Sequence, residues 1–351
     1  MPNSNLNRRQ FIRLNTSALA GAAIAPAAIT GEKQDTHIKT KDDNKSQSPG
    51  FYRFAFGELE ITVLSDGHFH YPVQFLAVEL DPLEAQAYGL DPATREEYFR
   101  SRLVPSDHIP LQVSPVVIDS GNQRTMVDSG RGTRDMTQYT TGRLGLSLEA
   151  AGIAPSSIDQ VILTHAHPDH MGGLLNPADG VPIFPDAEVV LSEEEFEFWM
   201  GDDVASRLEP PFVTEIAERF VAGVPGFLER LDNRIRTVQT EEEVAPGIRS
   251  IPSPGHTPGH ICVGVESGGK QLLLTGDAIV FNHASFEHPE WEFFGDMERE
   301  GAGRTRRRLL DRAAADEMLI LGYHFPFPGL GYALRHEDAY RWHPAGWTVL
   351  S

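Results

Sequence analysis

The sequence predicts one α/β domain, running from about Phe51 to the C-terminus, in which helices cover the sheets. Two observations predict this class. Strand-like runs are interspersed with helical segments along the whole stretch, and no repeat of fixed period is present. A chain of 351 residues is also long enough to bury a large core.

The expected elements can be read in order along the chain. GELEITVLSDG and QVSPVVIDSGNQRTMVDSG alternate as strands do, and a Gly-Asn pair in the second stretch marks a hairpin turn. Further strands are expected within IDQVIL, AEVVLS, IRSIPSPGHTPGH, HICVGVE, KQLLLTGD and MLILGYHFPFPG. Helices are expected at 81–103 with a break at Pro92, at 143–152 closing on Gly152, at 193–231 with interruptions at Pro210-Pro211 and Pro225-Gly226, and at 301–318.

The composition narrows the range of partners. Asp and Glu number 50 against 30 Lys and Arg, which gives a formal net charge of −20. Nucleic acids and anionic membranes need a basic surface, so neither is expected as a partner. The single cysteine, Cys262, excludes an intrachain disulfide and a thiolate metal cluster. In a strand-like segment it is expected to be a small buried hydrophobe, with a reactive thiol as the alternative.

The first 30 residues are expected to be a signal peptide. Paired arginines in RRQFI (8–12) precede an alanine-rich apolar stretch that ends in small residues. RRQFI resembles the bacterial twin-arginine export signal. Residues 31–50 are polar and are predicted to be a flexible linker. The mature protein is then expected to be periplasmic or secreted, without a membrane anchor.

The densest chemistry lies in THAHPDHMGG, residues 164–173, directly after the apolar run 161–163. In an extended segment His165 and His167 point the same way, because side chains alternate with period two. Asp169 and His170 follow at the turn. This spacing offers one metal ion two nitrogens and a second ion an oxygen and a nitrogen.

Three further residues that can bind metal end strand-like runs beside glycine. His256 lies in the turn SPGHTPGH, Asp277 follows LLLTG and His324 follows LILGY. Strand ends of this kind commonly present catalytic groups from a rigid scaffold. One such residue alone is more often a hydrogen-bonded cap. Together with 164–173, the three complete two coordination shells.

These motifs, in this order, resemble the metallo-β-lactamase-fold hydrolases from about Phe51 to the C-terminus. The resemblance implies an αββα sandwich with a dinuclear metal site at one edge. The ligands that it implies are His165, His167 and His256 for one ion, Asp169, His170 and His324 for the second, and Asp277 as the bridge. It also implies that Asp128, in TMVDSG, supports the ligand loop from behind.

Shorter stretches narrow the resemblance. FPFPGLGY (325–332) and EFWM (197–200) are similar to the methyl parathion hydrolase and lactonase-like group. The chain departs from that group at Tyr332, where a histidine is expected, and in the aromatic stretch 281–294. Trp199 is expected to line the substrate pocket, with ordinary core packing as the alternative.

The expected reaction is hydrolysis of a small-molecule ester-type bond, either an organophosphate triester or a lactone or aryl ester. The nucleophile would be a hydroxide bridging two divalent ions roughly 3.5–4 Å apart. Asp277 would fix the separation of the ions, and Asp169 would steer the hydroxide proton. Zn²⁺ is expected, with Mn²⁺, Fe²⁺ or Co²⁺ as alternatives.

Three other activities fit the same ligands. They are an acyl-homoserine lactonase as the main activity, a glyoxalase II-like thioesterase, and a non-catalytic metal-binding module. The thioesterase needs a C-terminal helical region, and 27 residues after His324 leave little room for one. A homodimer is expected by analogy alone.

Other polar residues have plainer expected roles. The run RTRRR (304–308) could bind an anion, but its helical spacing among acidic residues predicts a solvated face with i,i+4 pairs. His260 is expected to support its own turn, and His68 and His70 to be loop residues near the mouth of the site. Tyr323 and Tyr332 are candidates to assist lactone opening.

Overall fold

The computed structural model describes residues 50–72, 92–105, 108–132, 140–202, 204, 214–239, 241–291, 293 and 295–346. The predicted signal peptide at 1–30 and nearly all of the predicted linker at 31–50 lie outside these residues. Among the described helices, none is both long enough and apolar enough to cross a membrane.

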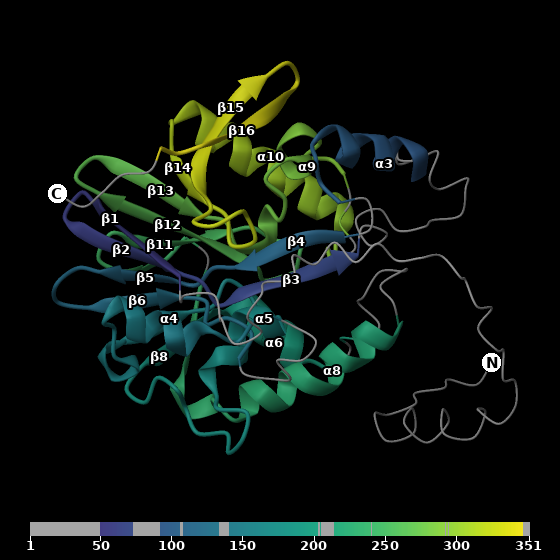
Figure 1. The fold of residues 1–351 in the computed structure, drawn as a ribbon. Coiled ribbons are helices and arrows are strands. Elements are labelled where there is room, and N and C mark those ends of the chain that lie inside the picture. Colours follow the sequence, from purple (N-terminus) through teal and green to yellow (C-terminus); the bar gives the residue numbers. More distant parts are fainter. Residues whose placement is uncertain are drawn as a thin grey trace, which may run out of the picture. The chain divides into compact units, whose positions relative to one another are not determined.

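Two seven-stranded sheets form the centre of the folded unit Pro49–Ser351 (Figure 1). The N-terminal sheet contains, in spatial order, β1 (Phe51–Phe56), β2 (Leu59–Leu64), β5 (Val116–Asp119), β6 (Arg124–Val127), β7 (Gln160–Ile162), β8 (Glu188–Ser192) and β9 (Ile235–Val238). The C-terminal sheet contains β10 (Glu243–Ala245), β11 (Ile248–Pro252), β12 (Ile261–Ser267), β13 (Lys270–Leu274), β14 (Leu319–Leu321), β15 (Leu330–His336) and β16 (Ala339–Pro344). A separate ribbon pairs β3 (Gly67–Pro72) with β4 (His108–Val113).

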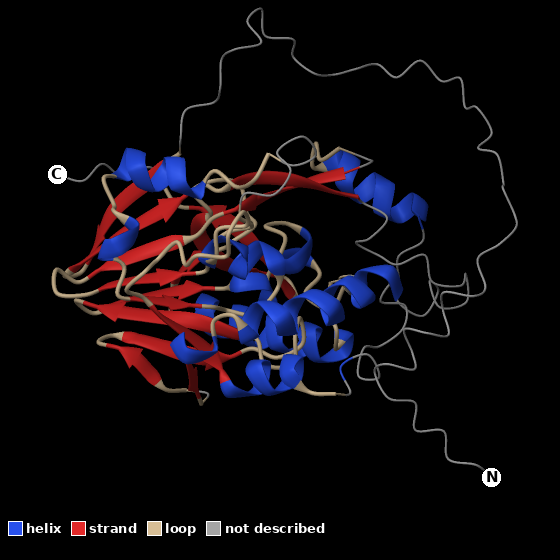
Figure 2. Cartoon of the chain, turned by 90° about the horizontal axis from the view of Figure 1, so that it is seen from below, coloured by secondary structure: helices blue, strands red, loops and turns tan. Residues whose placement is uncertain are grey.

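The sheets pack face to face because apolar side chains alternate along their strands. Ile162 and Val190 join the core between the sheets, whereas Val161 and Val189 join the core on the outer face of the N-terminal sheet. That outer face is covered by α4 (Leu144–Ala151), α6 (Glu193–Met200) and α8 (Thr214–Glu229). The C-terminal sheet is covered by α9 (Ala284–Glu287) and α10 (Arg299–Ala315). This is the predicted αββα order, and the view from below in Figure 2 shows helices in front of the strands.

A smaller layer lies over the end of the sandwich that carries the predicted ligands. Tyr98 and Phe99 of α3 (Pro92–Ser101) pack with Leu111 of β4 and with Phe281 and Phe293. The ribbon also contacts the ligand region directly, because His324 Nδ1 lies 2.6 Å from the carbonyl oxygen of Gln112.

Most of the predicted elements in the described residues are confirmed, and one is wrong. The hairpin is β5–β6, and α4 ends at Gly152, whose φ of 72° is the left-handed cap that favours glycine. The predicted break at Pro225 is wrong, because α8 continues through it. The predicted break at Pro210-Pro211 and residues 81–91 of the expected helix 81–103 lie outside the described residues. Leu228 is fully buried and Val224 is almost fully buried, and both pack in the core on either side of the proline. Packing there outweighs the lost backbone donor.

The burial of Cys262 is also confirmed. Its side chain is fully buried in the core under α10, and burial raises the pKa of the thiol to about 12.

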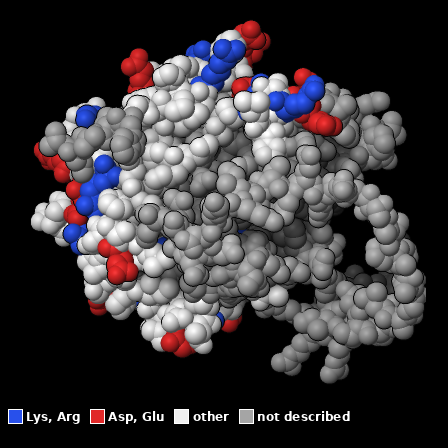
Figure 3. Space-filling view, in the orientation of Figure 1, with Lys and Arg blue, Asp and Glu red and all other residues white. Residues whose placement is uncertain are grey.

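On the face seen in Figure 3, acidic and basic side chains of described residues lie close to one another.

Asp66, just after β2, is a fully buried carboxylate held by backbone groups. It accepts hydrogen bonds from the N–H groups of Arg131 (3.0 Å), Gly142 (3.0 Å) and Leu144 (2.8 Å). Burial outweighs these hydrogen bonds and raises the pKa of Asp66 from 3.8 to about 6.

This raised pKa predicts a stability that falls as the pH rises. Between the two pKa values the native state holds the proton of Asp66 more tightly than the unfolded chain does, so stability is lost from about pH 4 to about pH 6. The shift corresponds to about 3 kcal/mol. We expect urea titrations to show the unfolding free energy of the wild type falling by about this much relative to Asp66→Asn over that range. A difference between the two proteins that does not change with pH would contradict the prediction.

Candidate metal centre

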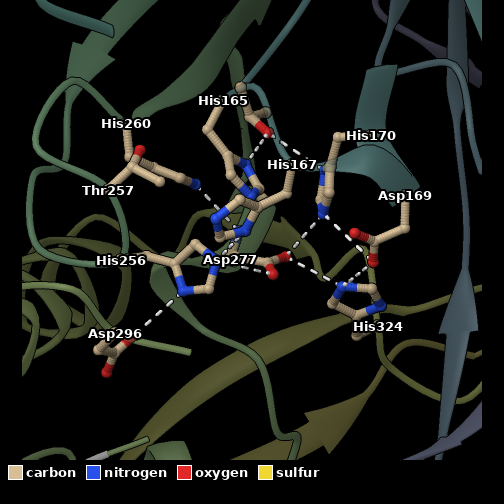
Figure 4. Close-up of polar contacts among 12 residues, drawn as sticks. His165, His167, Asp169, His170, His256, Thr257, His260, Asp277, Asp296 and His324 are labelled. Atoms are coloured by element: carbon tan, nitrogen blue, oxygen red, sulfur yellow. Dashed lines mark hydrogen bonds and ion pairs between the residues drawn. The ribbon is translucent and has the colours of Figure 1, made fainter. Parts of the chain in front are cut away.

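The structure brings all seven predicted ligands together at one end of the sheets, each from a segment that follows a strand (Figure 4). The loop after β7 carries the histidine-rich motif and continues into α5 (Pro168–Met171). The turn between β11 and β12 carries His256, the 3₁₀ turn η5 (Gly276–Ala278) after β13 carries Asp277, and His324 follows β14. Each side chain is therefore presented by a packed strand rather than by a long free loop.

The ligand atoms form three overlapping groups, and within each group all of them lie within 4.8 Å of one another. The groups are His165, His167 and His256; His165, His170 and Asp277; and Asp169, His170 and His324. The first and third groups are the two sets expected for two separate ions.

Asp277 connects these two sets (Figure 4). Its Oδ2 lies 3.3 Å from Nε2 of His256 in the first set. Its Oδ1 lies 3.2 Å from Nε2 of His170 and 3.1 Å from Nε2 of His324 in the second. One carboxylate thus turns an oxygen towards each set, as a bridging ligand must.

The donor atoms fit divalent cations. His165 Nε2 is a buried polar atom that has no hydrogen-bond partner among the described residues. His256 Nε2 faces His167 Nδ1 at 3.0 Å. Burial, together with the neighbouring histidines, holds the pKa of His165 and of His167 well below the usual value. Both rings are therefore neutral near pH 7, and a neutral imidazole is the form that binds metal.

The second set is richer in negative charge. Burial lowers the pKa of His170, but Asp277, Asp128 and Asp169 outweigh burial and raise it well above the usual value. His324 behaves in the same way, mainly through Asp277. The carboxylates that stabilise a proton on these rings provide the field that attracts a cation in its place.

Asp128 lies behind the ligand loop. Its Oδ2 is 2.8 Å from His170 Nδ1, and its Oδ1 accepts the backbone N–H of Thr164 at 2.8 Å. This contact at Nδ1 leaves His170 Nε2 pointing towards Asp277.

His260 does more than support its own turn. Its Nδ1 lies 2.8 Å from Ser253 Oγ, and its Nε2 accepts the backbone N–H of Asp277 at 3.0 Å. Burial, together with His256, holds the pKa of His260 well below the usual value, which leaves Nε2 free to accept. The ring therefore fixes the backbone that carries the bridging carboxylate.

Glu195 is buried at this site, and the sequence motifs did not predict its role. Four donors surround its carboxylate: Ala166 N–H (2.9 Å), Trp199 Nε1 (2.7 Å), Thr257 Oγ1 (2.6 Å) and Gly259 N–H (3.2 Å). Glu195 thereby joins the loop of His165 and His167 to the loop of His256.

A sequence signal for Glu195 does exist. Ser192 caps α6 by accepting the N–H of Glu195, so Ser192 and Glu195 have the spacing of a capping box. Here the glutamate side chain extends to the two ligand loops. Gly259 permits this close approach, because a Cβ there would lie 2.0 Å from the backbone nitrogen of Glu195.

Trp199 was expected to line the substrate pocket, but its position in the structure does not agree with that role. Its side chain is fully buried in the core under the N-terminal sheet, and its indole N–H is bonded to Glu195. Its ring meets that of His167 edge-on at 6.1 Å. Trp199 therefore packs behind the ligand loop, on the side away from solvent.

Two other expectations need correction. His68 and His70 lie on strand β3 rather than in a loop. In the run 304–308, Arg304 makes the predicted i,i+4 pair with Glu300, but Arg306 is only 2% exposed and pairs with the buried Asp296.

Aromatic rings border the candidate centre. Phe293 stacks on His256 with ring centres 5.9 Å apart, and Phe69 meets His324 edge-on at 5.7 Å. Tyr323 stacks on His170 at 4.1 Å, and its hydroxyl donates to the backbone oxygen of Asp169 at 2.7 Å. Burial raises the pKa of Tyr323 well above the usual value, so its hydroxyl stays protonated. Tyr332 is partly exposed, at 36%, on β15.

Comparison with known proteins agrees with this geometry. The family model of the metallo-beta-lactamase superfamily matches residues 108–324, which is more than half of the chain. The uncharacterized protein YobT of Bacillus subtilis is 25% identical over 206 residues, covering 57% of this chain and 79% of YobT. An N-acyl homoserine lactonase of a Bacillus species is 26% identical over 245 residues, covering 64% of this chain and 85% of the lactonase.

A solved structure shows the same fold. AidC, a dizinc quorum-quenching lactonase, superposes with a TM-score of 0.77 at 23% identity, covering 86% of this chain and 99% of AidC. At this identity the likeness shows the fold alone. The match of the family model over more than half of the chain shows that the chain belongs to the metallo-beta-lactamase superfamily.

Proposed function

We propose that the protein is a metal-dependent hydrolase of ester-type bonds that holds two divalent ions, with Zn²⁺ as the first candidate. The observation that carries the proposal is the position of Asp277, which turns one oxygen to each of two ligand sets. A mainly histidine set with a carboxylate suits zinc. Two divalent ions, when bound, supply Lewis acidity that lowers the pKa of water and polarises a carbonyl or phosphoryl oxygen.

Each set of residues would have its own role when metal is bound. His165, His167 and His256 would hold one ion, Asp169, His170 and His324 would hold the other, and Asp277 would contribute one oxygen to each set. The side chain of Asp169 is 21% exposed, whereas those of His170 and His324 are at most 1% exposed. Asp169 is thus the ligand that an entering substrate meets, and we assign it the transfer of a proton from the attacking water.

The surroundings favour an ester with an apolar part. Phe293 and Phe69 flank the centre beside His256 and His324. Such rings suit the acyl chain of a lactone or the aryl group of an aryl ester. Because a curated relative is named as an N-acyl homoserine lactonase, we place an acyl-homoserine lactone first. The stretch 325–332, similar to the methyl parathion hydrolase group, supports an organophosphate triester as the second candidate.

The test uses purified protein of known metal content. It compares an acyl-homoserine lactone, a nitrophenyl phosphotriester and a glutathione thioester, with His165→Ala as the control. We expect about two ions per chain and turnover of the lactone or the triester. Dialysis against a chelator should abolish this turnover, and added Zn²⁺ should restore it. Preference for the thioester would show that the proposed substrate class is wrong and that the protein is a thioesterase. If the metal-loaded protein hydrolyses none of the three substrates, the proposed hydrolase activity is refuted.

We also propose export of the protein by the twin-arginine route, on the basis of RRQFI at residues 8–12. Fractionation of a bacterial host should find the mature protein in the periplasm or medium. The variant with Arg8→Lys and Arg9→Lys should stay in the cytoplasm, and export of both forms alike would contradict the proposal.

A further inference from the structure

Beside His256 lies a buried ion pair that neither the metal motif nor the reaction accounts for. Asp296 and Arg306 form it, with Asp296 Oδ2 and an Arg306 terminal nitrogen 2.9 Å apart. The Asp296 side chain is fully buried and that of Arg306 is 2% exposed. Charges so deeply buried are costly unless they are fully hydrogen-bonded.

Both partners are extensively hydrogen-bonded. The other oxygen of Asp296 lies 3.1 Å from His256 Nδ1, the ring nitrogen opposite the one that faces Asp277 (Figure 4). Arg306 also donates to the carbonyl oxygens of Ala278 (3.1 Å), Pro289 (2.9 Å) and Trp291 (3.0 Å).

These contacts join three parts of the site. Ala278 is the residue after the bridging Asp277. Pro289 and Trp291 precede Phe293, which stacks on His256. The backbone adds to the connection, because Met297 N–H donates to the carbonyl oxygen of His256 at 3.1 Å. Arg306 thus reaches from α10 to the turn of Asp277, to the aromatic segment and, through Asp296, to the ring of His256.

We infer that Asp296 is a positioning residue for the metal centre, and that Arg306 holds it in place. Asp296 fixes the ring of His256 so that Nε2 faces His167 and Asp277. A carboxylate behind a histidine ligand fixes its orientation and strengthens it as a donor, and losing one typically costs about 10- to 100-fold in metal affinity. The inference rests on the proposed metal centre.

The test measures Zn²⁺ affinity by competition with a chromophoric chelator, starting from metal-free protein. In Asp296→Asn one of the two side-chain oxygens becomes an NH2 group, which cannot accept, so either His256 or Arg306 loses the oxygen that it contacts in the wild type. We expect one of the two ions to bind about 10- to 100-fold more weakly. Arg304→Met is the matched control, because Arg304 lies on the same helix but is 68% exposed. It should bind both ions as the wild type does.

A merely structural role predicts a different pattern. The ion pair would then stabilise the metal-free and loaded proteins equally, and Asp296→Asn would lower both unfolding midpoints by the same amount without changing Zn²⁺ affinity. That result overturns the inference. If Asp296→Asn fails to fold, Arg306→Lys decides. Its ammonium keeps the charge beside Asp296 but cannot hold the three carbonyl oxygens in the same fixed fork, so weaker Zn²⁺ binding supports the inference and unchanged binding refutes it.

Failure of the proposed function would look different again. Wild-type protein that binds no Zn²⁺ would refute the metal centre itself. Wild-type protein that binds two ions, beside an Asp296→Asn variant of equal affinity, would refute only the positioning role.

Discussion

Replacing Asp277 by asparagine is expected to reduce metal binding from two ions to one and to lower kcat/KM by roughly 100- to 1,000-fold. This is the loss typical of removing one preorganised electrostatic group at a reacting centre. The carboxylate turns Oδ2 towards His256 and Oδ1 towards His170 and His324. An asparagine keeps the shape but has only one oxygen that can accept, so it serves only one ligand set.

Metal analysis and steady-state kinetics on the same sample check this prediction. Asp316→Asn is the matched control, because its carboxylate is 48% exposed at the end of α10 and pairs only with Arg312 among the described residues. It should keep both ions and full turnover. A variant Asp277→Asn that retained two ions and wild-type kcat/KM would show that the bridge is not needed.

The ligands could be predicted because their signals are local. Four of them fall within six positions after an apolar run, and three others end strands beside glycine. The alternation of apolar and polar side chains along a strand indicates the face of the sheet to which its last residue points. The order of the layers could be predicted from local patterns too. Strands that are apolar on both faces must be covered on both faces, here by the other sheet and by helices.

The supports of the ligands could not be predicted, because their partners are remote in sequence. Glu195 receives hydrogen bonds from Ala166 and Gly259, which lie 29 and 64 residues away. Arg306 stands in a run of charged residues whose composition indicates a solvated face, and only the rotation of α10 on the C-terminal sheet buries it. The local sequence pattern predicts which face of a helix or strand a residue lies on. It does not predict which loop, remote in sequence, packs against that residue.

Replacing Glu195 by alanine is expected to lower the free energy of unfolding by about 4 kcal/mol, the largest loss of stability among the substitutions proposed. Its carboxylate is fully buried and receives two donors on each oxygen, from Ala166 and Trp199 on one and from Thr257 and Gly259 on the other. The Thr257 hydroxyl can rotate to another acceptor, but the two backbone N–H groups and the indole cannot. Each buried donor left unsatisfied costs about 1–3 kcal/mol. Glu195→Gln should lose less, because its amide oxygen still accepts two of the four.

Urea denaturation of the metal-free proteins measures this loss without the contribution of bound ions. Glu197→Ala is the matched control, since Glu197 is exposed on the same helix and its replacement should change stability by no more than about 0.5 kcal/mol. Because Glu195 joins the loop of His165 and His167 to the loop of His256, its loss should also weaken Zn²⁺ binding. A Glu195→Ala protein as stable as the Glu197→Ala control would mean that water replaces the carboxylate at the four donors. The two ligand loops would then be held together by the sheets alone, and the contact between α6 and Gly259 would be a consequence of the fold rather than a support of the site.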